Sequence, residues 1–248
     1  MANPIVSAAW LYEHLNDSNL IVLEARLEQN QSNLENQNPD LQIKGARLFD
    51  IKNNFSDTNN PLPNTFPSAA QFTAESQKLG IRKNSTIVVY DTLGIYSSPR
   101  AWWMFKAMGH SNVFVLDGGL PEWIKEGFPT EKQQPTTYPK GDFEAKFQPE
   151  LIKNKEQILE NISTKEAVLM DARSADRFYA TNEEPRAGLR SGHIPGSINV
   201  PFTELQQDGK FKSPQQVREI LNLNDQPLLF TCGSGITACI VLLATELI

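Results

Sequence analysis

A cysteine in a glycine-rich turn is the residue of this chain best suited to chemistry. The turn reads Cys232-Gly233-Ser234-Gly235-Ile236-Thr237. It follows an apolar segment that predicts a buried strand, and it precedes a segment that predicts a helix. The glycines allow the backbone to curl so that several amide hydrogens face one point, and a thiol near the start of a helix is favoured as the thiolate. The pattern therefore indicates a nucleophilic cysteine rather than a small thiol buried in a tight turn.

The surroundings of this turn exclude two other kinds of cysteine chemistry. The second cysteine, Cys239, lies in an apolar helical segment, and we expect it to pack in the core. Its spacing from Cys232 is not that of a C-x-x-C pair, which excludes a thioredoxin-type redox site. A cysteine phosphatase would need an arginine at the position of Ala238 to bind phosphate through two hydrogen bonds. The phosphatase interpretation therefore lacks its key residue.

The overall composition excludes several classes of partner. The 248 residues carry 23 basic and 29 acidic side chains, for a net charge of −6. A negative surface is a poor partner for nucleic acid or anionic lipid. No apolar run approaches the ~20 residues that span a bilayer, and the N-terminal segment lacks the features of a secretory signal. With only two cysteines and three histidines for a disulfide framework or a zinc cluster, we predict a soluble, cytoplasmic protein that binds neither nucleic acid nor membrane.

Segments typical of strands and helices alternate along the chain. Short runs of branched and aromatic residues predict strands at Leu20–Ala25, Thr86–Tyr90, Val113–Asp117, Ala167–Asp171 and Pro227–Thr231. Helical patterns that begin after a serine, whose side chain can cap the first amides, predict helices at Ala8–Leu15, Ala69–Leu79 and Gln215–Leu221. This alternation is typical of an α/β fold with a largely parallel sheet.

The two halves of the chain resemble each other. Asp91 and Gly94 match Cys232 and Gly235, and in both cases the match lies 141 residues further on. The repeat predicts a duplicated domain, with residues 1–130 as the first copy, a proline-rich linker at 131–150, and residues 151–248 as the copy that carries the cysteine. Because the chain ends at Ile248 inside the matching helix, we expect the second copy to lack the last strand and helix of the first.

Two irregular stretches rich in Asn and Pro interrupt the first half. We interpret Glu28–Asp40 as a solvated surface insertion. Lys52–Pro67 is long enough to be either a second insertion of that kind or a loop that leans over a site.

Several motifs together resemble one family, the tandem rhodaneses. They are the cysteine loop, Asp171-Ala172-Arg173, Pro185-Arg186, Gly192-His193-Ile194-Pro195-Gly196-Ser197 and Trp102-Trp103-Met104-Phe105. The loop itself is similar to that of the 3-mercaptopyruvate sulfurtransferase branch. Thiosulfate sulfurtransferases usually have Arg and Lys at the positions of Gly233 and Ser234.

This resemblance implies two rhodanese-like domains, each a mainly parallel sheet flanked by helices. It also implies that Cys232 is the nucleophile that accepts sulfur. Arg177 and Arg186 match the two arginines that hold the substrate's carboxylate and carbonyl, a task that suits a planar guanidinium. Asp91 cannot carry sulfur, so the first domain is expected to form one wall of the cleft. The amide cradle of the family matches Gly233, Ser234, Gly235, Ile236 and Thr237.

The first half departs from the family pattern at one point. Members of this branch commonly combine the loop serine with a histidine and an acid from the first domain. Ser234 is present and remains a candidate catalytic residue beside Cys232, but Asn64 stands in place of the histidine, and Lys52 or Asn53 in place of the acid. Because an amide does not titrate, we do not expect a general-base relay through Ser234.

The resemblance therefore implies a sulfurtransferase that uses no metal or organic cofactor. We expect sulfur to pass from 3-mercaptopyruvate to Cys232 as a persulfide, with release of pyruvate, and then to a small thiol, cyanide or a reduced thioredoxin-like protein. Two alternatives stay open. One is a thiosulfate sulfurtransferase, which Asn64 favours and Gly233 does not. The other is a persulfide carrier or binding module without turnover.

Overall fold

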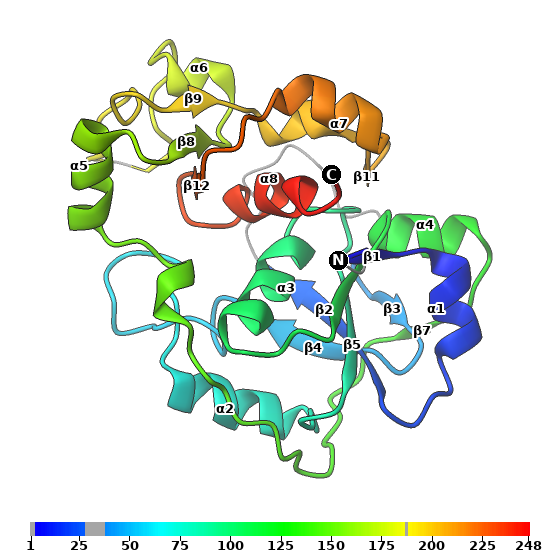
Figure 1. Cartoon of the computed structure of the whole chain (residues 1–248). Coiled ribbons are helices and arrows are strands. Elements are labelled where there is room, and N and C mark those ends of the chain that lie inside the picture. Colours follow the sequence, from blue (N-terminus) through cyan, green and yellow to red (C-terminus); the bar gives the residue numbers. More distant parts are fainter. Residues whose placement is uncertain (1–2, 28–37, 187) are drawn as a thin grey trace.

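Two α/β domains follow one another along the chain (Figure 1). The computed structural model describes residues 3–27, 38–186 and 188–248. In the main sheet of each domain, every pair of neighbouring strands is parallel. The expected α/β fold, with two mainly parallel sheets flanked by helices, is confirmed.

The N-terminal domain is built on a five-stranded sheet in the order β1-β6-β5-β2-β4. The strands are β1 (Ile5–Val6), β2 (Leu20–Arg26), β4 (Arg47–Asp50), β5 (Thr86–Tyr90) and β6 (Val113–Leu116). The helices are α1 (Ala8–His14), α2 (Ala69–Lys78), α3 (Ser98–Ala107) and α4 (Gly119–Lys125). Ser7 and Ser68 cap α1 and α2 as predicted, with their hydroxyls accepting backbone N–H bonds of 3.1 and 3.2 Å.

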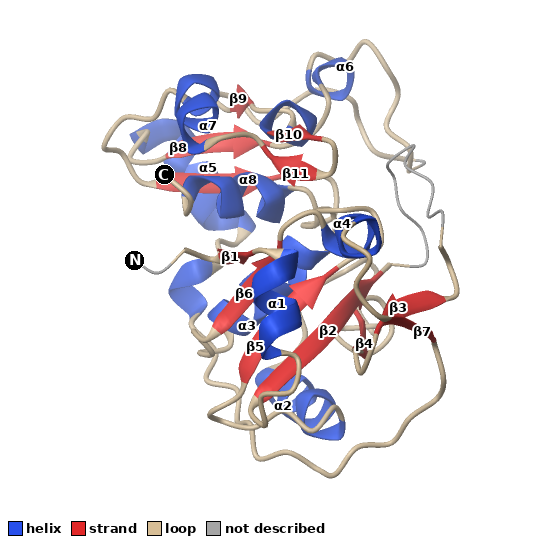
Figure 2. Ribbon diagram, turned by 90° about the vertical axis from the view of Figure 1, so that its right-hand side faces the viewer, coloured by secondary structure: helices blue, strands red, loops and turns tan. Residues whose placement is uncertain are grey.

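Alternating side chains explain why this sheet is covered on both faces. Along β2, Ile21 and Leu23 join a core cluster with α2 and α3, whereas Val22 between them joins a second cluster with α1 and α4. Successive side chains of a strand point to opposite faces, so a strand that is apolar at every position must lie inside the protein. Figure 2 shows helices on both sides of the sheet.

The C-terminal domain has a three-stranded sheet in the order β12-β8-β9. The strands are β8 (Val168–Asp171), β9 (Ile198–Asn199) and β12 (Leu228–Thr231), and the helices are α5 (Lys155–Thr164), α6 (Ala175–Phe178), α7 (Pro214–Leu221) and α8 (Ala238–Thr245). The prediction of a buried strand before the cysteine is wrong, because all of β12 is half-buried. Among the described strands β12 lies at a sheet edge, whereas its counterpart β5 has a neighbour on each side.

Helix α8 joins the two domains. Ile240 and Leu243 pack in the N-terminal cluster that contains Phe105 of α3, whereas Val241 and Ala244 pack in the core of the C-terminal domain. A helix that is apolar all round is stable only when it is covered on all sides. The helix that follows the cysteine loop therefore packs directly on the N-terminal domain.

Two short antiparallel ribbons and an extended segment complete the fold. The ribbons pair β3 (Leu41–Ile43) with β7 (Thr130–Lys132) and β10 (Gln206–Gln207) with β11 (Lys210–Phe211). The segment after β7 runs along the N-terminal domain, where Phe143 is buried in the core, and leads to the 3-10 turn η1 (Pro149–Leu151). The domain boundaries at residues 130 and 150 stay a prediction.

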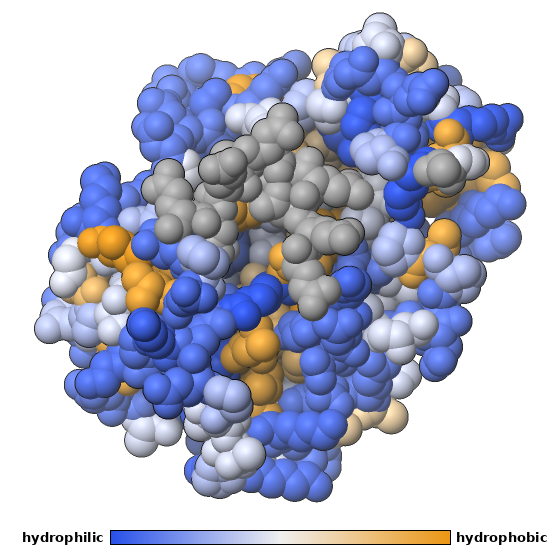
Figure 3. Space-filling view, turned by 180° about the vertical axis from the view of Figure 1, so that it is seen from behind, coloured by the Kyte–Doolittle hydropathy of each residue, from blue (hydrophilic) through white to orange (hydrophobic). Residues whose placement is uncertain are grey.

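The face of the molecule in Figure 3 is mostly hydrophilic, with apolar residues in small separate areas. Each helix in the described ranges is too short or too polar to cross a membrane. Most of the stretch that we interpret as a surface insertion, Glu28–Asp40, lies outside the described residues.

Candidate active site

Cys232 lies at the carboxyl end of its sheet, in the loop between β12 and α8. This end of a parallel sheet is where ligands bind in α/β proteins. The N–H of Gly235 donates to Cys232 Sγ over 3.1 Å, and Gly235 adopts a φ of 76°, which glycine takes without strain. The loop thus curls, as its glycines predict, and turns an amide hydrogen toward the sulfur.

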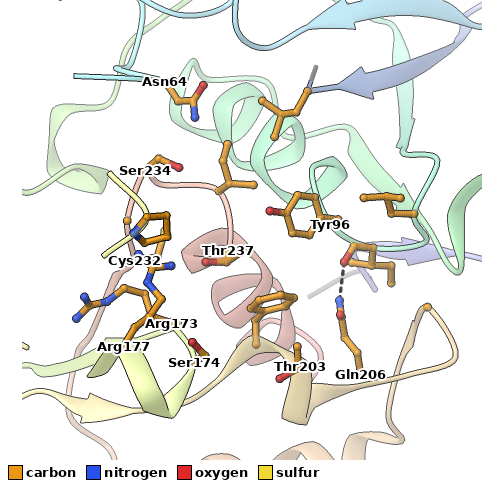
Figure 4. A pocket seen from close by; sticks show the side chains of 18 of the residues that line it. Asn64, Tyr96, Arg173, Ser174, Arg177, Thr203, Gln206, Cys232, Ser234 and Thr237 are labelled. Carbon is orange, nitrogen blue, oxygen red and sulfur yellow. Dashed lines mark hydrogen bonds between the residues drawn. The ribbon is translucent and has the colours of Figure 1, made fainter. Parts of the chain in front are cut away.

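A cavity of about 660 Å³ opens between the domains at this loop (Figure 4). Six of the predicted site residues line it, namely Arg177, Cys232, Gly233, Ser234, Ile236 and Thr237. The N-terminal domain contributes the facing wall, which is largely apolar and consists of Leu27, Asn64, Leu93, Ile95 and Tyr96. Both domains are therefore needed to enclose the space in front of Cys232.

Arg177 reaches the cavity from α6 and is held by a carboxylate. Its Nη2 and Nε lie 2.6 and 3.2 Å from the two carboxylate oxygens of Glu184. The hydrogen bond from Arg177 is the main reason why the pKa of the Glu184 carboxyl is lowered. Glu184 therefore stays ionised and fixes the guanidinium, which retains further N–H donors for a ligand.

A second arginine, Arg173, also lines the cavity. It donates to Asp171 Oδ2 over 2.6 Å and to Glu184 Oε1 over 2.8 Å. The hydrogen bond to Asp171 is the main cause that raises the pKa of Arg173. Arg173 and Arg177 thus both bond to the carboxylate of Glu184. Figure 4 shows the two arginines on the same side of the cavity.

Arg186 contacts the cysteine loop from outside the cavity. Its Nη2 donates to the carbonyl of Gly233 over 2.5 Å. Neither Arg186 nor Gly235 belongs to the cavity lining in the described part of the chain. Arg186 is therefore placed to hold the loop backbone, and a direct contact with a substrate would require its side chain to move.

The matching loop of the N-terminal domain holds an anion of its own. Asp91 is buried, and its Oδ2 accepts the backbone N–H groups of Tyr96, Ser97 and Ser98 over 2.8, 3.0 and 2.9 Å. The Ser98 hydroxyl and the N–H of Leu93 complete the set, at 2.6 and 3.0 Å. In this loop, converging amides bind one negative oxygen.

Comparison with known proteins identifies the duplicated unit. Residues 7–126 and 154–247 both match the rhodanese-like domain. The chain belongs to the rhodanese family.

Relatives of this rhodanese include 3-mercaptopyruvate and thiosulfate sulfurtransferases. It is 37% identical to the 3-mercaptopyruvate sulfurtransferase of Escherichia coli (strain K12), over 96% of this chain and 87% of the relative. It is 40% identical to the thiosulfate sulfurtransferase of Rattus norvegicus, over 98% and 86%. The crystal structure of SseA from Escherichia coli, described as a 3-mercaptopyruvate sulfotransferase, matches with a TM-score of 0.87 at 35% identity and covers 98% of this chain and 94% of that one.

The N-terminal domain brings Asn64 to the same cavity as Ser234 in this rhodanese (Figure 4). The stretch Lys52–Pro67 is therefore the loop that leans over the site, the second of the two interpretations. Asn53 bonds to Asp50 instead, with its Nδ2 2.8 Å from Asp50 Oδ2. Neither Lys52 nor Asn53 lines the cavity in the described residues. A titrating relay through Ser234 would lack its histidine here.

Cys239 packs in the core, as its apolar surroundings predict. Burial raises the pKa of the Cys239 thiol to about 12, and the charge of Arg100 opposes that rise. The thiol lies 3.3 Å from the carbonyl oxygen of Gly235 and donates to it. Cys239 is therefore a protonated part of the loop's support, in contrast to Cys232, which faces the cavity.

The sequence did not predict a role for Glu184 or Arg173 in this site, nor for Arg100, which contacts the cysteine loop at the carbonyl of Gly235. Arg173 lies in Asp171-Ala172-Arg173, one of the motifs that resemble the family, and that motif was a signal for it. Glu184 adjoins Pro185-Arg186, but no local pattern shows that it pairs with Arg177. Within the described ranges, no group of three or more His, Cys, Asp or Glu side chains could hold a metal ion.

Proposed function

We propose that this rhodanese is a sulfurtransferase that takes sulfur from 3-mercaptopyruvate and holds it as a persulfide on Cys232. One observation carries the proposal: Cys232, with a backbone amide 3.1 Å from its sulfur, shares a cavity with Arg173 and Arg177. A nucleophilic sulfur and two cations in one small cavity suit a thiol-bearing carboxylate. The 3-mercaptopyruvate sulfurtransferases among the relatives support the choice of donor.

In the first half-reaction, the Cys232 thiolate attacks the thiol sulfur of 3-mercaptopyruvate. An S–S bond forms while the C–S bond breaks, and the electron pair of that bond leaves with the three-carbon fragment as the enolate of pyruvate. The enolate then takes up a proton to give pyruvate. Arg177, fixed by Glu184, is proposed to hold the donor's carboxylate and carbonyl, and its charge stabilises the enolate as it develops.

The Asp91 loop supports a specific place for the outer sulfur of the persulfide. A carboxylate oxygen of aspartate is the third atom from Cα, and so is the outer sulfur of a cysteine persulfide. Tyr96, Ser97 and Ser98, whose amides bind Asp91 Oδ2, match Thr237, Ala238 and Cys239 in the repeat. We infer that the amides of Thr237 and Ala238 bind the outer sulfur, whereas the N–H of Cys239 already donates to the carbonyl of Ile236 over 3.1 Å.

In the second half-reaction, an acceptor takes the outer sulfur and regenerates the Cys232 thiolate. A small thiol, cyanide or a reduced thioredoxin-like protein can do so by attacking that sulfur and breaking the S–S bond. The cavity of about 660 Å³ exceeds the volume of a three-carbon acid several-fold. It therefore leaves room for a small acceptor beside the apolar wall formed by the N-terminal domain. A cytoplasmic location is part of the same proposal.

Thiosulfate is the second candidate donor, because a thiosulfate sulfurtransferase is among the relatives and Asn64 replaces the histidine. Thiosulfate is a compact dianion, and its binding should benefit from cations in the loop itself, where Gly233 and Ser234 supply none. We therefore expect this protein to prefer 3-mercaptopyruvate. Steady-state kinetics with each donor, at equal concentrations and with cyanide as acceptor, test this, and faster turnover of thiosulfate would contradict it.

A loop exchange sharpens this test. Gly233→Arg with Ser234→Lys should move the preference toward thiosulfate by about tenfold, since each new charge acts within hydrogen-bond range of the donor. A Cβ at position 233 would lie 2.9 Å from Arg177 Nη2, so that side chain must shift to make room. Gln215→Arg with Asn224→Lys, which adds the same charge at two exposed positions, is the control and should leave the preference unchanged.

The remaining alternative is a persulfide carrier without turnover. A carrier would release at most one equivalent of pyruvate per protein, even with excess acceptor. Release of many equivalents would exclude it.

A further inference from the structure

Arg100 of the N-terminal domain lies behind the cysteine loop. It belongs to α3, the helix against which α8 packs (Figure 1). The residue is buried, with a relative exposure of 5%, and its guanidinium carbon lies 5.2 and 5.6 Å from the ring centroids of Trp103 and Phe66. Arg100 has no part in the proposed chemistry so far, although it is one of the few buried charges next to the site.

Two backbone carbonyls connect Arg100 to both sides of the cavity. Its Nη1 donates to Gly235 O over 3.3 Å, and its Nη2 donates to Asn64 O over 2.9 Å. Gly235 supplies the amide that contacts Cys232 Sγ, and Asn64 is the cavity residue of the N-terminal loop. One side chain therefore sets the position of both loops relative to α3.

The bond to Gly235 O also orients the peptide that follows. The C=O of a residue and the N–H of the next residue point in opposite directions in a trans peptide. A donor that holds Gly235 O on the α3 side turns the N–H of Ile236 the other way. Arg100 thus favours the curled loop in which amides face the sulfur.

The charge of Arg100 lacks a carboxylate partner. No ion pair joins it to any Asp or Glu in the described residues, and its Nε is buried without a hydrogen-bond partner there. A buried charge is costly unless it is paired. The charge of Arg100 also acts on the Cys239 thiol, but that thiol stays protonated, so the sulfur anion left for Arg100 to offset is that of Cys232, first as thiolate and then as persulfide.

We propose that Arg100 is a positioning residue for the sulfur chemistry of the neighbouring domain: it holds the cysteine loop in its anion-binding conformation and supplies positive charge behind the Cys232 sulfur. The inference rests on the proposed function for its kinetic consequence. The effect of Arg100 on the Cys232 thiol before any donor binds does not depend on the proposed function and requires only that the protein is folded. On this proposal the N-terminal domain contributes to the reaction as well as to packing, because the Cys232 loop of the C-terminal domain depends on the charge of Arg100.

The test compares Arg100→Met with Arg100→Lys and with Arg47→Met. Methionine keeps the bulk of the side chain and removes the charge and the donors, whereas lysine keeps the charge. Arg47 is the matched control, since it also donates to a backbone carbonyl, that of Leu79, and stacks on an aromatic ring, that of Tyr138, elsewhere in the N-terminal domain. Thermal unfolding of each variant shows that it is folded at the assay temperature.

Two rates are measured on the full chain: alkylation of Cys232 by iodoacetamide at pH 7, and pyruvate release in the first turnover with 3-mercaptopyruvate. In Arg100→Met both should fall by about tenfold, because the loop loses the donor that holds Gly235 O and a positive charge beside the reacting sulfur. The donor concentration for half-maximal rate should stay unchanged, since Arg100 does not line the cavity. Arg100→Lys should recover most of the loss, and Arg47→Met should match wild type.

Rates within a factor of two of wild type in a folded Arg100→Met variant would overturn the inference, and so would an equal loss in Arg47→Met. If Arg100→Met does not fold, Arg100→Gln replaces it, because the amide keeps a hydrogen-bond donor and loses the charge. If wild type releases no pyruvate, the proposed function fails, and the alkylation rates still decide whether Arg100 acts on the thiol.

Discussion

The two loops at the carboxyl ends of β5 and β12 occupy matching positions in the two domains, but one holds a carboxylate and the other a thiol. In the N-terminal loop, five donors converge on the buried carboxylate of Asp91. In the C-terminal loop, the sulfur of Cys232 accepts a hydrogen bond from the backbone N–H of Gly235 and faces a cavity. In the first loop the Asp91 side chain occupies the anion-binding position permanently. In the second loop we expect that position to be occupied only while Cys232 carries the transferred sulfur.

This difference separates the requirements of structure from those of chemistry. A fixed anion satisfies the amides permanently and so stabilises the N-terminal fold. A thiol leaves part of the amide set for the transferred sulfur, at some expense in stability. The duplicated chain thus has one copy of the loop serving folding and another available for reaction, and the N-terminal copy shows which amides bind an anion.

The largest effect is expected from making the second loop like the first. Cys232→Asp should reduce pyruvate release to background, a loss of at least about a thousandfold, because the nucleophile is absent. It should also be more stable than Cys232→Ala by about 1–2 kcal/mol, since the carboxylate can accept the loop amides. Steady-state kinetics and urea unfolding measure the two quantities. Equal stability of the two variants would contradict the likeness of the loops.

The reverse change empties the first loop. Asp91→Ala should lower the free energy of unfolding by about 3 kcal/mol, because buried N–H groups lose their acceptor. Urea unfolding at pH 7 measures it, with Asp225→Ala at an exposed position as the control. A loss as small as that of the control would show that Asp91 does not hold the loop.

The arginines are expected to have a smaller effect, on catalysis alone. Arg177→Ala and Arg186→Ala should each lower kcat/KM for 3-mercaptopyruvate by about 10–100-fold, corresponding to ~1.5–3 kcal/mol for a charge-assisted hydrogen bond. We expect Arg177→Ala to raise KM more, because Arg177 lines the cavity, whereas the described part of the lining does not include Arg186. Arg218→Ala on the exposed face of α7 is the control, and kinetics like wild type in both variants would exclude an arginine clamp.

The smallest effect concerns pH. The pKa of Glu184 is lowered in the folded protein, mainly by Arg177, so the unfolded chain binds more protons near the ordinary value of 4.5. The stability that its charge contributes is present above that value and is lost as pH falls through the lowered one. Wild type should therefore be more stable than Glu184→Gln at pH 7, and the gap should narrow in acid. Unfolding at pH 7 and pH 4 measures it, and a gap independent of pH would contradict the ion pairing.

Local pattern was sufficient for much of the fold. The predicted strand Thr86–Tyr90 matches β5 at both ends, because a run of branched and aromatic residues that are apolar on both faces favours a parallel strand covered on both sides. The helix caps Ser7 and Ser68 followed from side chains that satisfy free amides next to them. The burial of β12 was mispredicted, because the number of neighbours of a strand is a property of the sheet and not of its own residues.

The site was predictable where its residues share one loop and hidden where they come together by folding. The cysteine and its glycines carry their chemistry in consecutive residues. Arg100 reaches Gly235 across 135 residues of sequence, and no periodicity predicts that contact. The family resemblance predicts that Arg186 binds the substrate. In the structure its guanidinium donates to the carbonyl of Gly233, and direct binding of the substrate by Arg186 stays a prediction.

One measurement tests the central claim most directly. The full chain is mixed with one equivalent of 3-mercaptopyruvate without acceptor, pyruvate is quantified, and each cysteine peptide is weighed by mass spectrometry. The account predicts one pyruvate per chain and one added sulfur atom on the peptide of Cys232, with that of Cys239 unchanged. Pyruvate without added sulfur on Cys232, or sulfur found only on Cys239, would contradict it.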